Sequence, residues 1–152
     1  MADITGARIR VTRTVAWGET DAAGHNHFSA AFRWLEETEH ALYRCLGFDT
    51  AMIDRVPRVH IEVDYRSRLY YGEEITCEVG VVALGTSSCT FDLRVSRGAD
   101  VAISGSYVVV HVSATTAGAS PWPEGMRRAL AEPQAFAIDL VARPQGQNVN
   151  NG

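Results

Sequence analysis

Hydrophobic and polar positions alternate along most of this chain with the two-residue period of β-strands, but one long segment follows a different period. From Ala30 to Leu46 there is neither Gly nor Pro, and apolar side chains recur at the three- and four-residue spacing of a helix with one buried face. Ser29 stands at the N-cap position, and Gly47 stands where a left-handed C-cap residue is expected. The pattern therefore predicts a helix of roughly 25 Å, long enough to cross a small sheet.

The alternating segments predict five strands, with boundaries at turn-forming residues. They are Ile9 to Trp17, Arg58 to Tyr65, Glu74 to Leu84, Ser87 to Arg97 and Val101 to Val112. The last three are separated by segments short enough for hairpins, which predicts an antiparallel meander. One amphipathic helix and five half-buried strands indicate an α+β domain, in which an antiparallel sheet wraps round the helix.

The C-terminal part of the chain has a weaker pattern. Residues Pro123 to Glu132 predict a short helix, and the periodic signal fades beyond Pro133. The end of the chain, Gln145 to Gly152, is polar and unpatterned. We therefore expect a single domain over residues 1–132 and a disordered tail over residues 133–152.

Composition narrows the classes of function. A net charge of -4 argues against a nucleic-acid or anionic-membrane partner, since both need a clustered basic surface. The N-terminal residues lack the apolar core of a signal peptide, and no apolar run is long enough to span a membrane, so we expect a cytoplasmic protein. All fourteen basic residues are Arg, which excludes a Schiff-base lysine. The three widely spaced cysteines predict buried, reduced thiols.

Two carboxylates interrupt the amphipathic pattern of the predicted helix. Glu39 falls inside the apolar arc, and Glu36 falls at its edge. Because burying an unpaired carboxylate is costly, each must reach a partner, a subunit boundary or a cavity, unless it simply extends from the helix edge into water.

The segment before the helix has the composition of a polar turn. Residues Trp17 to His25 contain two glycines and a central Asp21, a residue that commonly forms turns and can also act as a catalytic carboxylate. The five histidines do not support a metal site, because the sequence has no HExxH or CxxC arrangement. A GxSxG nucleophile motif is absent from the sequence as well.

Three stretches together resemble the hotdog-fold acyl-CoA thioesterases of the 4-hydroxybenzoyl-CoA thioesterase-like branch. They are VAWGETDAAGHNHFSAAFRWLEE from Val15, YRSRL from Tyr65 followed by Tyr71-Gly72-Glu73, and GTSSCTF from Gly85. The resemblance covers roughly Ile9 to Val112, and its first stretch is the most specific. It implies a hotdog fold, a five-stranded antiparallel sheet around one central helix, assembled as a homodimer or homotetramer with active sites at subunit boundaries.

The resemblance also assigns roles to individual residues. Asp21 matches the catalytic aspartate, and Phe28 matches the residue whose backbone amide polarises the thioester carbonyl. Glu36 matches an acidic helix position that faces the substrate pocket in some members, and it is the second candidate catalytic carboxylate. Trp17 is predicted to contact the substrate, and His25 either contacts the substrate or stabilises the loop. We expect neither a cofactor nor a metal.

The sequence therefore predicts a hydrolase acting on a coenzyme A or acyl-carrier-protein thioester. A carboxylate for attack and N–H donors at a helix N-terminus are the groups that this reaction needs. Alternatives on the same scaffold are a dehydratase, a polyketide-tailoring enzyme and a non-catalytic acyl-binding protein. Four arginines are candidates for the coenzyme A phosphates, although surface arginines are usually only solvated: Arg66, Arg68, Arg94 and Arg97.

Overall fold

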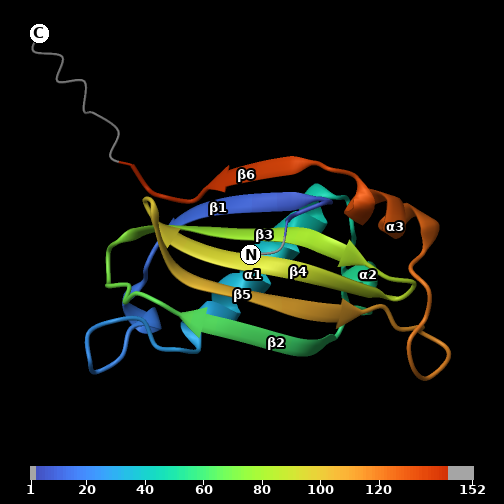
Figure 1. Ribbon diagram of the computed structural model, residues 1–152, viewed down its shortest axis with the longest axis horizontal. Helices are drawn as coiled ribbons and strands as arrows, with labels where there is room; N and C mark the ends of the chain where they lie inside the picture. The colour runs from blue at the N-terminus through green and yellow to red at the C-terminus, as the bar shows by residue number, and fades with distance from the viewer. Residues whose placement is uncertain (1–2, 144–152) are drawn as a thin grey trace, which may run out of the picture.

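In the computed structural model, which describes residues 3–143, one curved sheet wraps round one long helix (Figure 1). The strands lie in the order β2-β5-β4-β3-β1-β6. The elements are β1 (Arg8–Thr14), the 3-10 turn η1 (Trp17–Glu19), α1 (Ala30–Cys45), α2 (Thr50–Ile53), β2 (Arg58–Tyr65), β3 (Glu74–Leu84), β4 (Ser88–Arg97), β5 (Asp100–Val110), α3 (Glu124–Ala131) and β6 (Ala135–Asp139).

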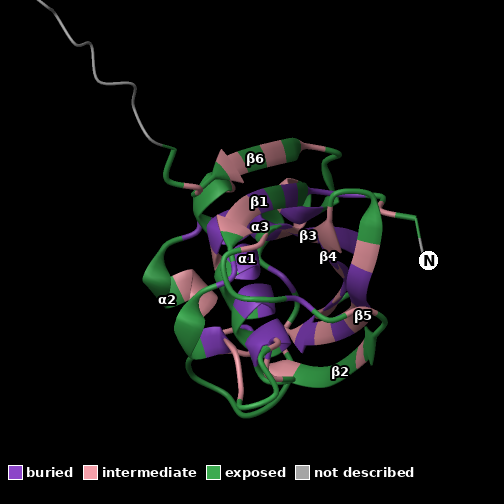
Figure 2. Cartoon of the chain, turned by 90° about the vertical axis from the view of Figure 1, so that its left-hand side faces the viewer, coloured by how far each residue is buried: buried purple, intermediate pink, exposed green. Residues whose placement is uncertain are grey.

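The central helix α1 confirms the prediction from sequence. It begins after Ser29 and ends at Cys45, and Gly47 then takes the left-handed conformation, with φ of 81°. Trp34 and Leu42 are fully buried beneath the sheet, and Figure 2 shows α1 enclosed by the strands. No helix within residues 3–143 is long and apolar enough to span a membrane.

The predicted meander is confirmed, because β3 pairs antiparallel with β4 and β4 pairs antiparallel with β5. The bounds predicted for β2 and β3 match the structure, whereas the first strand ends at Thr14 because Trp17–Glu19 forms a 3-10 turn. Strand β1 pairs antiparallel with β3 on one side and parallel with β6 on the other.

The prediction of five antiparallel strands is wrong in one respect, because β6 adds a sixth strand. It pairs parallel with β1, placing Phe136 beside Ile9 and Ile138 beside Val11. The tail predicted for residues 133–152 is therefore wrong at Ala135–Asp139, where Phe136 and Ile138 pack partly buried against the core. Residues 144–152 of that predicted tail lie outside the described residues.

Burial also departs from the sequence pattern at two places. The alternation in β2 predicts one buried face, yet Val59 and Ile61 are exposed at the edge of the sheet. Cys45, expected to be buried with the other thiols, is exposed at the end of α1. In both places the side chains lie at the boundary of the core rather than beneath it, so periodicity alone overstates their burial.

Candidate active site

The segment joining η1 to α1 folds into a closed polar turn. Thr20 and Asn26 pair as an antiparallel bridge, and the Asp21 N–H donates to the His25 carbonyl at 3.0 Å. The Gly24 N–H donates to the Asp21 carbonyl at 2.9 Å, and Gly24 has a φ of 87°, which favours glycine. The turn predicted from composition is therefore present, with Asp21 at its first corner.

The Asp21 side chain has two separate surroundings for its two oxygens. One oxygen, Oδ1, accepts a hydrogen bond from the Ala23 N–H at 2.9 Å, which is an Asx-type turn contact. The second oxygen accepts no hydrogen bond from any residue in the described part of the chain. Asp21 thus shapes the turn and still offers a free acceptor.

A pocket of about 450 Å³ opens beside this turn at the end of strand β2. Its walls come from the turn, from the start of α1 and from the chain that leaves β2. The lining residues are Asp21, His25, Asn26, Phe28, Tyr65, Arg66, Ser67 and Arg68. The size falls within the range of small-molecule sites, and the lining combines aromatic surface with carboxylate, amide and guanidinium groups.

The backbone at Phe28 provides a hydrogen-bond donor at the start of α1. The Phe28 N–H donates to no group within residues 3–143, whereas the Ala30 N–H is already bonded to the His27 carbonyl at 3.0 Å. Tyr65 fixes this backbone from β2, since its hydroxyl donates to the Phe28 carbonyl at 2.6 Å. Burial raises the pKa of Tyr65, so the hydroxyl keeps its proton and remains a donor. Ser29 does not cap the helix; its hydroxyl lies 2.7 Å from His27 Nδ1.

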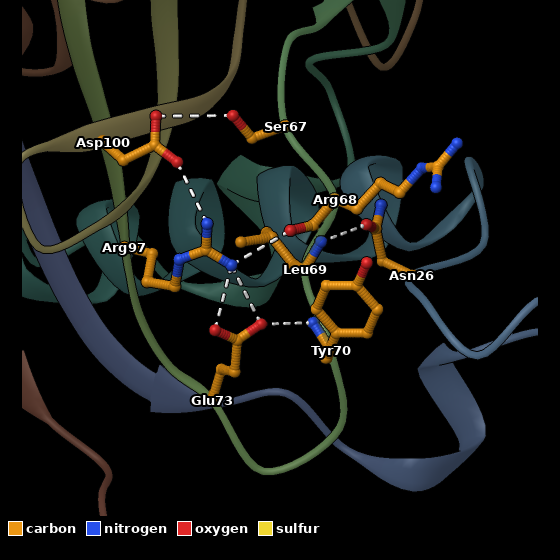
Figure 3. Close-up of polar contacts among 8 residues, drawn as sticks. All are labelled: Asn26, Ser67, Arg68, Leu69, Tyr70, Glu73, Arg97 and Asp100. Atoms are coloured by element: carbon orange, nitrogen blue, oxygen red, sulfur yellow. Dashed lines mark hydrogen bonds and ion pairs between the residues drawn. The ribbon is translucent and has the colours of Figure 1, made fainter.

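The segment after β2 is braced from the β4–β5 hairpin (Figure 3). Arg97 donates to both carboxylate oxygens of Glu73, at 3.0 and 2.9 Å, and to the Arg68 carbonyl at 3.1 Å. It also donates to Asp100 at 3.1 Å. Hydrogen bonding to the Glu73 carboxylate raises the pKa of Arg97 further. Arg97 is therefore engaged in holding this segment.

The other three arginines predicted for phosphate binding differ in position. Arg66 and Arg68 line the pocket, and Arg66 donates through Nε to Ser104 at 3.2 Å. Arg94 lies on β4 outside the pocket lining, with a guanidinium nitrogen 4.0 Å from Asp92. The pocket thus brings two of the four arginines close to Asp21.

Glu36 and Glu39 share one partner, Arg58 at the start of β2. Glu39 is only 1% exposed and accepts from Arg58 at 2.7 and 3.1 Å, whereas Glu36 is largely exposed and accepts at 3.2 Å. Burial acts to lower the pKa of Arg58, but the Glu39 carboxylate outweighs it, and the pKa is raised. Glu39 therefore has a partner, as the sequence requires, and Glu36 lies outside the pocket of Asp21.

The structure brings three of the five predicted site residues into one pocket. Asp21, His25 and Phe28 line it, whereas Trp17 is 73% exposed and packs edge-on against Tyr71 at 5.4 Å between ring centroids. The roles predicted for Trp17 and Glu36 remain predictions.

Sequence reasoning missed Asn26 and Tyr65 as pocket residues. Asn26 follows the predicted polar turn, which ends at His25, and Tyr65 is the last residue of the predicted strand Arg58 to Tyr65. Tyr65 is the last residue of β2 and stands just before the arginine-rich segment, a position that could have indicated a pocket residue.

Other chemistry-bearing groups do not gather near this pocket. Within residues 3–143 no three His, Cys, Asp or Glu side chains are placed to hold a metal ion. Burial raises the pKa of Cys77 to about 12 and also raises that of Cys89, which keeps both thiols protonated and poorly nucleophilic. Asp21 is the one carboxylate among the described residues that line the pocket.

Comparison with known proteins identifies the family. The family model described as the thioesterase-like superfamily matches residues 15–130. A 1,4-dihydroxy-2-naphthoyl-CoA hydrolase of Prochlorococcus marinus is 33% identical over 113 residues, covering 66% of this chain and 72% of the relative.

Solved structures give the same result. A predicted thioesterase from Bacillus stearothermophilus aligns with a TM-score of 0.75 at 25% identity, covering 84% of this chain and 99% of that one. A gentisyl-coenzyme A thioesterase aligns with a TM-score of 0.72 at 25% identity, covering 80% and 99%. These matches confirm the predicted hotdog architecture and the expectation of a thioester hydrolase, and the chain belongs to the thioesterase-like superfamily.

Proposed function

We propose that this chain hydrolyses an acyl-coenzyme A thioester in the pocket beside Asp21. The observation that carries the proposal is the presence, at one pocket, of an Asp21 oxygen and a Phe28 N–H that both lack a partner among the described residues. Thioester hydrolysis needs a carboxylate to attack or to activate water, and a fixed donor where negative charge develops on the carbonyl oxygen. The partial positive charge at the start of α1 assists that donor.

Two routes use these groups, and both release an acid and a thiol. In the first, Asp21 attacks the carbonyl carbon, the C–S bond breaks to form an anhydride and a thiolate, and water then hydrolyses the anhydride. In the second, Asp21 takes a proton from water while the water oxygen bonds to the carbonyl carbon, and the departing thiolate is protonated. Single turnover in ¹⁸O-water identifies the first route when water attacks the Asp21 carboxyl carbon of the anhydride, because an unlabelled Asp21 oxygen then remains on the first product.

A hydroxylated aromatic acyl group is the substrate class that we infer. Relatives are named as hydrolases of 1,4-dihydroxy-2-naphthoyl-CoA and of gentisyl-CoA. In this chain, Phe28 and Tyr65 provide aromatic surface in the pocket, and Arg66 and Arg68 provide forked donors suited to the phosphates of coenzyme A. These features support coenzyme A rather than a carrier protein as the thiol component.

The exposed edge strand β2 supports an active site shared between two copies of the chain. Strand β2 is an open edge of the sheet, and it exposes apolar Val59 and Ile61 beside the pocket residue Tyr65. A second copy paired on this edge would satisfy the free strand and cover apolar surface. Glu36 and Trp17, outside the pocket of one chain, are proposed to contact substrate in this assembly.

Incubation with a panel of thioesters tests the proposal. Purified protein is mixed with aromatic and aliphatic acyl-CoA esters and with acyl-carrier-protein thioesters, and the released thiol is followed with a chromogenic thiol reagent. We expect release from hydroxylated aromatic acyl-CoA esters at the highest kcat/KM. No release from any member of the panel would sink the proposal.

A further inference from the structure

Asn26 is a buried polar residue that joins the two loops of the pocket. It is only 6% exposed and lies opposite Thr20 in the turn of Asp21. Its backbone N–H donates to the Leu69 carbonyl at 2.7 Å, and its side-chain Oδ1 accepts from the Leu69 N–H at 3.0 Å. Asn26 therefore ties the Asp21 turn to the segment after β2 by two hydrogen bonds to one residue.

The contact with Leu69 fixes which way the Asn26 amide points. A backbone N–H can only donate, so the side-chain atom facing Leu69 must be the oxygen. The amide nitrogen, Nδ2, is directed away from Leu69, on the side where the Arg68 side chain runs (Figure 3). Asn26 lines the pocket together with Arg68 and Asp21, and Nδ2 donates no hydrogen bond to any described residue. A donor of known orientation is thus left over at the pocket.

The brace from β4 and β5 holds Leu69 in place from the opposite side. Arg97 bonds the carbonyl of the preceding residue, Arg68, and bonds Glu73, whose carboxylate also accepts from the Tyr70 N–H at 2.6 Å. Leu69 itself is fully buried. The backbone that orients the Asn26 amide is therefore fixed on both sides, which makes the donor pre-organised rather than induced by a ligand.

A ligand that fills the pocket changes the surroundings of this donor. It displaces water from Nδ2, and the free energy of binding then depends on whether the ligand supplies an acceptor in return. Sites that hold a buried donor discriminate against ligands that leave it unpaired. Asp21 lines the same pocket, so the acyl part of a thioester reacting there lies close to Asn26.

We propose that Asn26 Nδ2 donates a hydrogen bond to an oxygen acceptor on the acyl group, and that Asn26 thereby sets acyl specificity. Arg97 acts through Leu69 and is a positioning residue for this contact. The inference rests on the proposed thioesterase function, because it needs the acyl group to bind in the pocket of Asp21. The ligand class is an aromatic acyl group with an oxygen substituent.

The test uses pairs of substrates that differ in a single acceptor. Methoxybenzoyl-CoA and ethylbenzoyl-CoA have nearly the same shape, but only the methoxy group can accept a hydrogen bond, and each ring position gives one pair. The wild-type protein should prefer the methoxy member of at least one pair in kcat/KM. Asn26→Asp keeps an acceptor for Leu69 but removes the donor, and it should lower that preference by about 3- to 10-fold, the value of one neutral hydrogen bond.

Each comparison is a ratio within one variant, so a general loss of activity cancels, including any effect of the added charge on Asp21. Arg97→Gln should lower the same methoxy-to-ethyl ratio, and Arg97→Lys should give a ratio between those of Arg97→Gln and the wild type. Arg127→Gln is the matched control, because Arg127 braces the carbonyls of Gly85 and Thr86 in the β3–β4 hairpin, distant from the pocket. It should leave the ratio unchanged.

A second measurement does not depend on turnover. Thioether analogues of the same pairs, with a methylene between the carbonyl and the sulfur, are titrated by calorimetry, and the ratio of their Kd values should change in the same way. The inference is overturned if Asn26→Asp leaves the methoxy-to-ethyl preference within about twofold of the wild-type value. It is also overturned if the wild-type protein shows no preference in any pair. Failure of the proposed function is seen separately, as an absence of turnover with every thioester.

Discussion

At the scale of single residues, one substitution can separate the turn contact of Asp21 from the catalytic role that we propose for it. Asn keeps the oxygen that accepts from the Ala23 N–H but removes the charge and the basicity of the second oxygen. We expect Asp21→Asn to lower turnover by on the order of 10² to 10⁴, the usual contribution of a general base, with little change in Tm. Steady-state kinetics and thermal unfolding of the same preparation check both parts.

Glu36→Gln is the comparison for that result, because Glu36 lies outside the pocket in the single chain. We expect it to alter the preferred acyl group more than the maximal rate. If Asp21→Asn retains activity while Glu36→Gln or Glu39→Gln abolishes it, the helix carries the base and the assignment of Asp21 is wrong.

The three cysteines should differ in reactivity because their burial differs. Burial raises the pKa of Cys77 to about 12 and raises that of Cys89, so both thiols stay protonated and shielded at pH 8, whereas Cys45 is exposed. A chromogenic thiol reagent should therefore label one thiol per native chain and three in denaturant. Rapid labelling of Cys77 or Cys89 in the native protein would contradict the burial of these strands. The result also sets the background of the thiol-release assay.

At the scale of elements, the sequence predicted those parts whose signals are local. The helix α1 has a sustained apolar period with Ser29 before it and Gly47 after it, and β3 and β4 alternate over ten or more residues. Strand β6 has only five residues, and its parallel partner β1 lies more than a hundred residues earlier. A signal that short cannot be told from loop composition, so β6 was missed.

The candidate site likewise has one part that local sequence signals predict and another part that they do not. The Asp21 turn and the helix start lie within one continuous stretch, and both could be predicted from it. The contacts of Asn26 with Leu69 and of Arg97 with Glu73 join residues 43 and 24 positions apart. Both contacts reach the segment between β2 and β3 from distant parts of the chain. Periodicity does not specify such long-range packing, so neither Asn26 nor the bracing role of Arg97 was predictable.

The ion pair between α1 and β2 permits a matched prediction. Glu39→Gln removes the buried partner of Arg58, while Glu36→Gln removes the exposed one. We expect Glu39→Gln to lower the free energy of unfolding by about 1 to 3 kcal/mol, less than for a fully buried pair because Arg58 keeps Glu36 and some solvent. Glu36→Gln should cost less than about 1 kcal/mol. Urea unfolding measures both, and equal costs would show that burial does not govern this pair.

At the scale of the whole molecule, the two edge strands of the sheet differ in length. Strand β6, paired on one side with β1, has five residues, whereas β2, paired on one side with β5, has eight. Figure 2 shows β2 largely exposed along its length. Phe28 and Phe32, at the start of α1, are exposed as well, and the hydrogen bond from Tyr65 to Phe28 joins the two surfaces. Apolar surface on this scale beside an open edge is typical of a subunit interface.

Charge placed on that edge tests both assembly and the shared site. Val59 on β2 is 60% exposed and Leu140, beyond β6, is 63% exposed, so the two residues are matched in exposure at opposite edges. We expect the wild-type protein to sediment as a dimer or tetramer of 16.6 kDa chains, and Val59→Glu to shift it toward the monomer, since burying an unpaired carboxylate is costly. Because Phe28 and Tyr65 lie both at this surface and in the pocket, dissociation should lower kcat/KM by about 10-fold or more. Leu140→Glu should change neither mass nor activity, and a wild-type monomer that is fully active would show that each chain carries a complete site.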